Sequence, residues 1–155
     1  MRAITVTEHG GPEVLTYGEA PDPVPGPGQV LVRTSAIGVN FIDIYFRSGA
    51  YKAASLPFTP GKEGAGEVTA VGEGVSGFKV GDRVGVGWFA HSCLSCHTCM
   101  SGRHNLCPDA AGVASARQGR YGGFAERVRA QGAWAIPIPD GVDAAKAGPL
   151  FAASC

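Results

Sequence analysis

Four of the five cysteines in this chain lie between residues 93 and 107, and no other feature constrains the fold as strongly. Their spacing is C-x2-C-x2-C-x7-C, at Cys93, Cys96, Cys99 and Cys107. Four thiolates this close together can surround one Zn²⁺ tetrahedrally and leave no position for water, so the metal would be structural. Two local disulfides or four unrelated thiols are the alternative, but only Cys155 lies elsewhere, which favours the metal. We expect a zinc lobe over about residues 90–110.

The charge balance and the start of the chain exclude several classes of partner. The 155 residues suffice for one domain, and 13 basic and 13 acidic residues give a formal net charge of zero. We therefore expect neither nucleic acid nor an anionic membrane as a partner. The first residues lack the apolar core of a secretion signal, and no stretch is long enough to span a bilayer. Together with metal-binding cysteines in their reduced form, this predicts a cytoplasmic protein.

The distribution of glycine and proline predicts a mainly β fold with tight turns. The 24 glycines and 11 prolines fall between short apolar runs. We expect strands at residues 3–7, 14–17, 29–39, 66–71, 80–88, 124–128 and 133–136. Residues 40–47 can form a short helix with Asn40 as its N-cap and Asp43 in its first turn. Residues 143–153 form the best helix candidate, with a kink or restart at Gly148-Pro149.

The segment G-E-G-V-S-G at residues 72–77 matches the G-x-G-x-x-G pattern of dinucleotide-binding loops. That function requires a helix directly afterwards, whose N-terminus receives the pyrophosphate. The sequence continues as F-K-V-G-D-R-V, which indicates a turn followed by a strand. We therefore interpret residues 72–77 as a hairpin loop.

Five motifs agree in order and spacing with a known family. They are G-V-N-F-I-D-I-Y-F-R-S-G at 38–49, P-G-K-E-G-A-G-E-V at 60–68, V-G-E-G-V-S-G-F-K-V-G-D-R-V at 71–84, the cysteine lobe, and Y-G-G-F-A-E at 121–126. In this order the chain resembles the N-terminal catalytic half of the medium-chain dehydrogenase/reductase superfamily. The resemblance implies a GroES-like, partly open barrel with short helices and a zinc lobe over residues 1–142. Residues 143–155 would then begin the helix that leads to a Rossmann domain, which is absent here, so that we expect a fragment or a naturally short protein.

Two branches of this superfamily share features with the chain. The N-F-I-D-x-Y-x-R-S-G form resembles the quinone oxidoreductases, which use NADPH to reduce quinones or activated double bonds by hydride transfer. The cysteine lobe resembles the structural zinc loop of the alcohol dehydrogenases, which quinone oxidoreductases often lack. The resemblance therefore implies a chain that combines features of both branches.

A second, catalytic zinc distinguishes the alcohol dehydrogenases of this family, which hold it through two cysteines and a histidine. The positions that match the first cysteine and the histidine hold Asn40 and Lys62. An amide is a poor zinc ligand, and a charged ammonium cannot coordinate. We therefore expect no catalytic zinc. Cys155 is a candidate for the third ligand, although a lone cysteine is more often a small buried residue.

Without a Lewis acid, the reaction needs hydrogen-bond donors at the developing oxyanion and close alignment with the nicotinamide. The candidate catalytic residues are Asn40, Tyr45 and Lys62. The candidate cofactor and substrate contacts are Asn40, Tyr45 and Tyr51. Asp43 and Glu63 would orient their neighbours. The structural alternatives are a helix cap for Asn40, a core aromatic with a solvated hydroxyl for Tyr45 and a surface charge for Lys62.

The resulting hypothesis is the catalytic-domain part of an NADPH-dependent oxidoreductase that reduces quinones or α,β-unsaturated carbonyl compounds, with one structural zinc per chain. The alternatives are a zinc-dependent alcohol or polyol dehydrogenase and a non-enzymatic zinc-stabilised GroES-like binding module, because a fold alone fixes no activity. We expect the chain alone to bind NADPH poorly and to be inactive, since the pyrophosphate contacts would lie in the missing half. A small-molecule substrate is the expected partner. An apolar face near Leu150 and Phe151 would favour a homo-oligomer.

Overall fold

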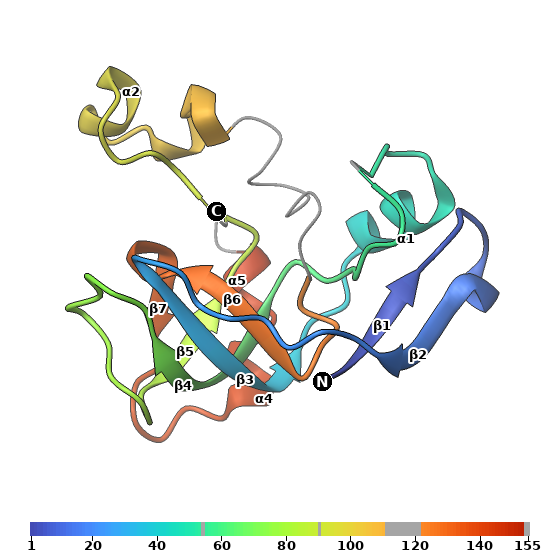
Figure 1. The fold of residues 1–155 in the computed structure, drawn as a ribbon, viewed down its shortest axis with the longest axis horizontal. Helices are drawn as coiled ribbons and strands as arrows, with labels where there is room; N and C mark the ends of the chain where they lie inside the picture. Colours follow the sequence, from blue (N-terminus) through green and yellow to red (C-terminus); the bar gives the residue numbers. More distant parts are fainter. Residues whose placement is uncertain (54, 90, 111–121, 154–155) are drawn as a thin grey trace.

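The computed structural model describes residues 1–53, 55–89, 91–110 and 122–153, and its strands form two antiparallel sheets (Figure 1). The strands are β1 (Arg2–Val6), β2 (Leu15–Glu19), β3 (Gln29–Ile37), β4 (Gly64–Val71), β5 (Arg83–Val86), β6 (Arg127–Gln131) and β7 (Ala135–Pro137). The helices are η1 (Pro12–Val14), α1 (Phe41–Ser48), α2 (His97–Met100), η2 (His104–Leu106), η3 (Pro108–Ala110), η4 (Gly132–Trp134), α4 (Ala144–Ala147) and α5 (Leu150–Ala153). These elements confirm the predicted mainly β fold with short helices.

The larger sheet has five strands in the order β6-β3-β4-β5-β7 and encloses a core of small β-branched side chains. Val30 and Val32 on β3, and Val68 opposite Val32 on β4, are fully buried. They share one face because side chains alternate along a strand. Irregularities in the pairing of β3 with β4, at Leu31/Val32 and Thr34/Ala36, increase the local twist. The sheet therefore curls into the predicted partly open barrel, as Figure 1 shows.

The smaller sheet, β1 with β2, is joined to the rest of the chain by the outer edge of β1. The N–H of Ile4 donates to the carbonyl of Phe124, and the N–H of Val6 donates to that of Phe58, both at 2.8 Å. The segments 58–61 and 122–124 are in turn bonded to each other, for example from the N–H of Gly123 to the carbonyl of Gly61 at 3.1 Å. These bonds fix the backbone that leads up to Lys62.

Several predicted strand boundaries were wrong, each for a local reason. The strand expected at 80–88 is only Arg83–Val86, because Gly81 has a φ of 94° and forms a turn with its neighbours. The strand expected at 124–128 begins at Arg127, because Ala125 forms a bridge to Ala3 on β1 instead. The segment expected as a strand at 133–136 is divided into η4 and β7.

The strand expected at 29–39 ends at Ile37, and the one expected at 66–71 begins at Gly64, where it still pairs with Ile37. The strands expected at residues 3–7 and 14–17 are observed as β1 (Arg2–Val6) and β2 (Leu15–Glu19). The two strands pair without a register shift. The hairpin interpretation of 72–77 is confirmed, because no helix follows and Gly72 donates its N–H to the carbonyl of Gln29 at 2.7 Å.

The predicted helix at 143–153 is interrupted at Gly148-Pro149, as its sequence suggested, and forms α4 and α5. Ala147 of α4 packs with Ala65 of β4 and with Ile138, which follows β7, and Phe151 of α5 lies against the same cluster. Leu150 is 59% exposed. Phe151 is partly buried, so the expected apolar face near Leu150 and Phe151, and with it a homo-oligomer, stay predictions.

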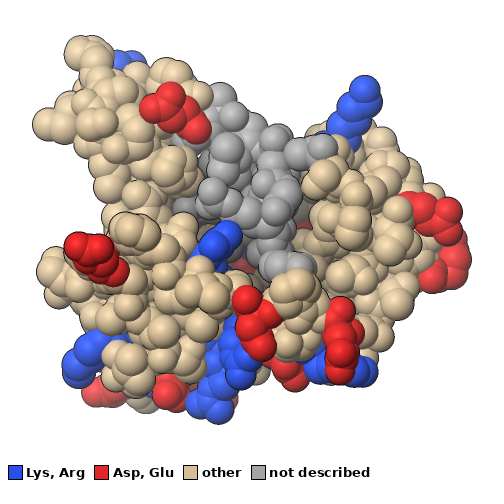
Figure 2. All heavy atoms as spheres, viewed as in Figure 1, with Lys and Arg blue, Asp and Glu red and all other residues tan. Residues whose placement is uncertain are grey.

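Basic and acidic side chains are intermingled on the face that Figure 2 shows. Two exposed ion pairs of the chain are Arg33–Glu67 at 3.2 Å and Lys79–Asp82 at 2.6 Å. Exposed pairs of this kind stabilise a fold by less than about 1 kcal/mol, so the fold depends on its core. In the part of the chain that the structure describes, no helix is long and apolar enough to cross a bilayer.

Candidate functional site

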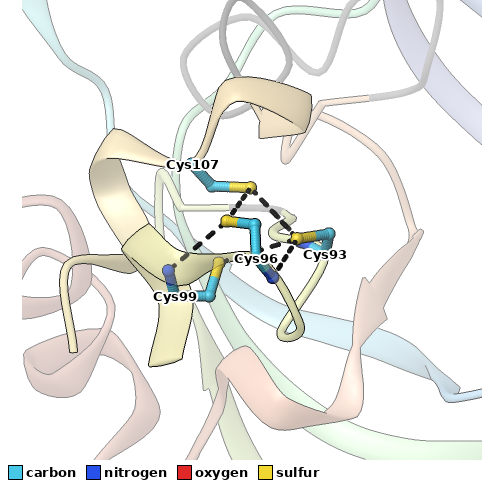
Figure 3. Close-up of side chains that lie close together, drawn as sticks. All are labelled: Cys93, Cys96, Cys99 and Cys107. Carbon is cyan, nitrogen blue, oxygen red and sulfur yellow. Dashed lines mark hydrogen bonds between the residues drawn. The ribbon is translucent and has the colours of Figure 1, made fainter. Parts of the chain in front are cut away.

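The four cysteines of the lobe converge on one point, toward which Figure 3 shows their sulfur atoms directed. The Sγ–Sγ distances are 3.6 Å for Cys93–Cys107, 3.8 Å for Cys93–Cys99 and 4.0 Å for Cys96–Cys107. A tetrahedral zinc with Zn–S bonds of about 2.3 Å separates its sulfur ligands by about 3.8 Å. A disulfide needs sulfur atoms at about 2.05 Å, and all four thiols are free. The cluster fits a metal ion and not the disulfide alternative.

Backbone N–H groups point at the sulfur atoms and prepare them for a cation. Cys96 donates its N–H to Cys93 Sγ at 3.3 Å, and Cys99 donates its N–H to Cys96 Sγ at 3.4 Å. Bonds from the N–H groups of Ser95 and Cys96 lower the pKa of the Cys93 thiol to about 6. Burial, with the neighbouring thiols, raises the pKa of Cys99 to about 12. A divalent cation held by Cys93, Cys96, Cys99 and Cys107 would favour the thiolate form of all four.

The lobe projects from the larger sheet in Figure 1 and is attached to it by side-chain contacts. The amide of Gln131 accepts the Ser92 N–H at 3.3 Å and donates to the Ser92 carbonyl at 3.5 Å. The Trp134 ring lies edge-on to Phe89, with ring centres 4.6 Å apart. The ring centre of His104, a residue of the lobe, lies 4.9 Å from that of Trp134. Together with Trp88 and Phe151, among others, these three rings line a cavity of about 630 Å³.

A second polar cluster lies where the N-terminus of α1 meets the segment 61–63. Asn40 is the N-cap of α1, as predicted, and its backbone N–H donates to Asp43 Oδ2 at 2.9 Å. Its side-chain Nδ2 donates to Glu63 Oε1 at 2.9 Å. Asp43 Oδ1 accepts the N–H of Gly61 at 3.1 Å. Two carboxylates thus hold the segment 61–63 against the start of α1.

Asp43 is buried, and its two oxygens accept two backbone N–H groups. Burial raises the pKa of this carboxyl, while the bonds from Asn40 and Gly61 and the charge of Lys62 oppose the rise. The predicted orienting role of Asp43 agrees with these bonds.

Lys62 is only 6% exposed, and its Nζ lies 4.6 Å from the centre of the Phe46 ring. A cation over an aromatic face is attracted by the negative face of the ring. The structure therefore contradicts the surface-charge alternative for Lys62.

Tyr45 and Tyr51 pack against each other, with ring centres 5.2 Å apart, at the end of α1 and the following turn. Tyr45 is 42% and Tyr51 50% exposed, so the core-aromatic alternative for Tyr45 is wrong. Both rings are accessible to a ligand. Their roles in binding stay predictions.

Two contacts at this cluster could not be predicted from the sequence, because no motif or spacing relates the residues that make them. Glu63 Oε2 accepts the N–H of Ala152 at 2.7 Å, from a helix 89 residues later in the chain. Gly38 provides the space that the Glu63 carboxylate occupies. Cys155, the predicted candidate for a third zinc ligand, and Tyr121 of the last motif lie outside the described residues.

Comparison with known proteins decides the family. Residues 26–140 match the family described as the alcohol dehydrogenase GroES-like domain. This chain is a member of that family. The GroES-like domain is the N-terminal part of medium-chain dehydrogenases/reductases, which confirms the superfamily that the motifs predicted.

The relatives of this GroES-like domain carry several activities in their names. The aldehyde reductase AdhA of Synechocystis sp. is 43% identical over 126 residues, which are 81% of this chain and 37% of that protein. An alcohol dehydrogenase of Geobacillus stearothermophilus is 37% identical over 99% of this chain and 44% of its own length. A quinone oxidoreductase of Pseudomonas aeruginosa is 57% identical over 54% of this chain and 26% of its own. The GroES-like domain thus spans less than half the length of these relatives.

Solved structures of both branches share the fold. A thermostable alcohol dehydrogenase from Pyrobaculum aerophilum superposes on 95% of this GroES-like domain and 43% of its own chain, with a TM-score of 0.83 at 36% identity. The Escherichia coli quinone oxidoreductase, solved with NADPH, superposes on 95% of this chain and 36% of its own, with a TM-score of 0.69 at 32% identity.

Replacing Asp43 by alanine is expected to lower the free energy of unfolding by about 2–4 kcal/mol, because two N–H groups lose their acceptor and the helix loses part of its cap. The effect should depend on pH. Since burial raises the pKa of Asp43 above its usual 3.8, the folded state holds the proton more tightly than the unfolded chain. The wild-type advantage should therefore be largest below pH 3.8 and shrink as pH rises through the folded-state pKa. Urea titrations between about pH 3 and 7 measure the difference in the free energy of unfolding between the wild type and Asp43→Ala. The control is Asp140→Ala, a substitution at an exposed residue. A gap that widens with rising pH would contradict this account.

Proposed function

We propose that this chain is the catalytic-domain part of an NADPH-dependent oxidoreductase that reduces quinones or α,β-unsaturated carbonyl compounds by hydride transfer, without a catalytic zinc. The observation that carries the proposal is the pair Asn40 and Lys62 at one cluster of the fold. Relatives named quinone oxidoreductase and aldehyde reductase support an oxidoreductase. A nicotinamide bound by the remainder of such an enzyme would supply the hydride.

The chemistry of the cluster suits an oxygen that gains negative charge. An amide carries two N–H donors, and Asn40 uses one of them for Glu63. The second can donate to a substrate oxygen. The ammonium of Lys62 adds a buried positive charge to the same cluster, since both Lys62 and Asn40 act on Asp43, and a charge in a low-dielectric site acts more strongly than in water. Addition of hydride to the substrate leaves an enolate or hydroquinone oxygen, which these groups would stabilise before it takes a proton.

One structural zinc in the four-cysteine lobe belongs to the same proposal. The sulfur spacings and the N–H donors around them support it. Four sulfur ligands leave no open position, so this metal would hold the lobe and not a substrate. Among the described residues, these four cysteines alone form a group of three or more His, Cys, Asp or Glu side chains placed to hold a metal.

A zinc-dependent alcohol dehydrogenase is the second candidate, favoured by relatives with that name over nearly the whole chain. It would need ligands other than Asn40 and Lys62. A non-enzymatic binding module is the third, and it would leave Asn40 without any effect on turnover.

The test is made on a full-length protein that contains this chain. NADPH oxidation with a quinone acceptor should fall about 100-fold in kcat for Asn40→Ala and for Lys62→Met, because each removes one group that stabilises the oxyanion. Lys79→Met, on a side chain that is 84% exposed, is the matched control and should keep its kcat within about twofold. Metal analysis should find one zinc per chain.

The competing candidates give different results in the same measurements. Two zinc ions per chain together with oxidation of alcohols would favour the alcohol dehydrogenase. No hydride transfer with any acceptor, and no effect of Asn40→Ala, would favour the binding module. Full quinone reduction by Asn40→Ala would sink the role given to that residue.

A further inference from the structure

We propose that Glu63 is a positioning residue, which fixes the orientation of the Asn40 amide and ties it to the backbone of α5. The inference rests on the proposed role of Asn40 in substrate binding. It goes beyond that role because the orientation of the Asn40 amide is assigned to Glu63, a residue that does not touch the substrate.

The two oxygens of Glu63 face two different parts of the chain. Oε1 accepts the side-chain Nδ2 of Asn40 at 2.9 Å, and Oε2 accepts the backbone N–H of Ala152 at 2.7 Å. Glu63 is 3% exposed, so water does not compete for these oxygens. One side chain therefore links the N-terminus of α1, the segment 61–63 and α5.

Only a group that accepts on both sides satisfies this arrangement. Both partners of Glu63 are N–H donors, and an ionised carboxylate is an acceptor at each oxygen. A glutamine at position 63 has one acceptor, its amide oxygen, and one donor group, its NH₂. Its NH₂ must therefore face either the N–H of Ala152, which is also a donor, or the Asn40 side chain, whose amide must then rotate to present its oxygen. In the second case the amide oxygen of Asn40 would face Glu63 and both of its N–H groups would change direction.

The Glu63 carboxylate can occupy its position because residue 38 is glycine and has no side chain there. A side chain at Gly38 would put a Cβ at 2.7 Å from Cδ and 2.9 Å from Cγ of Glu63, and nearer still to Oε1. Real Cβ atoms are not found that close, so an alanine there must push the carboxylate aside. The atoms that must move are the far end of a flexible side chain, which makes the change tolerable for folding. Gly38→Ala is therefore a way to displace Glu63 without removing any charge.

The link also joins the polar cluster to the aromatic cavity. Ala152 follows Phe151, which is one of the residues that line the 630 Å³ cavity. Asn40 and Lys62 are not among the residues that line this cavity. The Glu63 carboxylate is thus the contact through which the position of α5, and with it one wall of the cavity, is coupled to the direction of the Asn40 amide.

Amide hydrogen exchange and side-chain NMR of residues 1–155 test the link without any assay of turnover. The exchange of the Ala152 N–H should rise roughly tenfold in Glu63→Gln and in Gly38→Ala, the loss expected for one hydrogen bond to a charged group. The side-chain NH₂ resonances of Asn40 should shift in both variants. Glu67→Gln, an equal loss of charge on the exposed face of β4, should change neither signal.

The double variant Gly38→Ala/Glu63→Gln should behave like either single one, because both disrupt the same contact. Unchanged Ala152 exchange, or unchanged Asn40 resonances, in both single variants would overturn the inference. So would additive effects in the double variant.

Kinetics on the full-length protein separate this inference from the proposed function. Glu63→Gln should lower kcat with little change in KM, and combining it with Asn40→Ala should add no further loss. If Glu63→Gln lowers kcat in the Asn40→Ala background as much as it does in the wild type, the positioning role is wrong. If the NMR signals change as expected while Asn40→Ala keeps full activity, the positioning of Asn40 stands and the proposed function of Asn40 fails.

Discussion

Removal of the zinc proposed for the four-cysteine lobe is expected to unfold residues 93–107 while the five-stranded sheet persists. The lobe has almost no core of its own, because its buried cluster consists of the cysteines themselves and Met100 and Leu106 are exposed. Structural zinc ions in small domains bind with an apparent free energy of about 10–16 kcal/mol, and here that energy would replace apolar packing. The sheet has a separate core of valines and alanines, so we expect it to persist without the lobe.

Cys107→Ser and treatment with a chelator should give the same result. Zinc content should fall from one per chain to near zero, and the N–H groups of Cys96 and Cys99, which donate to sulfur, should lose their protection from exchange. Amides of β3 and β4 should keep theirs. Cys155→Ser, at a cysteine outside the motif, is the control and should retain the metal. A Cys107→Ser protein with a full complement of zinc and a protected lobe would contradict the predicted metal site.

Gly66→Ala is expected to destabilise the fold by about 3 kcal/mol or more, because β3 and β4 cannot approach each other with a side chain at this position. A Cβ there would lie 2.8 Å from the carbonyl carbon of Arg33 and 3.0 Å from Cα of Thr34, and closest to the Arg33 carbonyl oxygen. These are backbone atoms of the neighbouring strand, so no side-chain rotation relieves the clash. The midpoint of urea unfolding should fall accordingly.

Gly18→Ala is the matched control, since it also lies on a strand but has no atom within 4 Å of the added Cβ. Its free energy of unfolding should stay within about 1 kcal/mol of the wild type. Equal midpoints for Gly66→Ala and the wild type would show that β3 and β4 can separate without cost, contrary to their pairing here.

The start of α1 illustrates what short-range pattern can predict. Asn40 followed three residues later by Asp43 is a local signal for a helix N-terminus, and Gly49 closes the helix with a φ of 83°. The cysteine spacing is equally local, because the two short helical turns α2 and η2 and the loops around them suffice to bring the four sulfur atoms together. The exclusion of residues 72–77 as a dinucleotide loop needed only the residues that follow.

The boundaries of the strands were less predictable, because they depend on which partner a backbone group finds. Ala125 looked like the start of a strand in the sheet, yet it bridges to Ala3 at the other end of the chain. The burial of Lys62 could not be predicted either. An ammonium is usually exposed, whereas the fold brings the Phe46 ring of α1 to 4.6 Å from Lys62 Nζ.

The residue pattern alone therefore determined the mainly β fold, the clustering of the four cysteines and the amide and amine at positions 40 and 62, since each depends on side-chain chemistry or on contacts within a few residues. The tertiary structure decided how those groups are held. Glu63 meets Ala152 across 89 residues of chain, and Gly38 makes room for it. Such contacts arise only when the curled sheet closes, because packing between distant segments leaves no periodic mark on the sequence of either one.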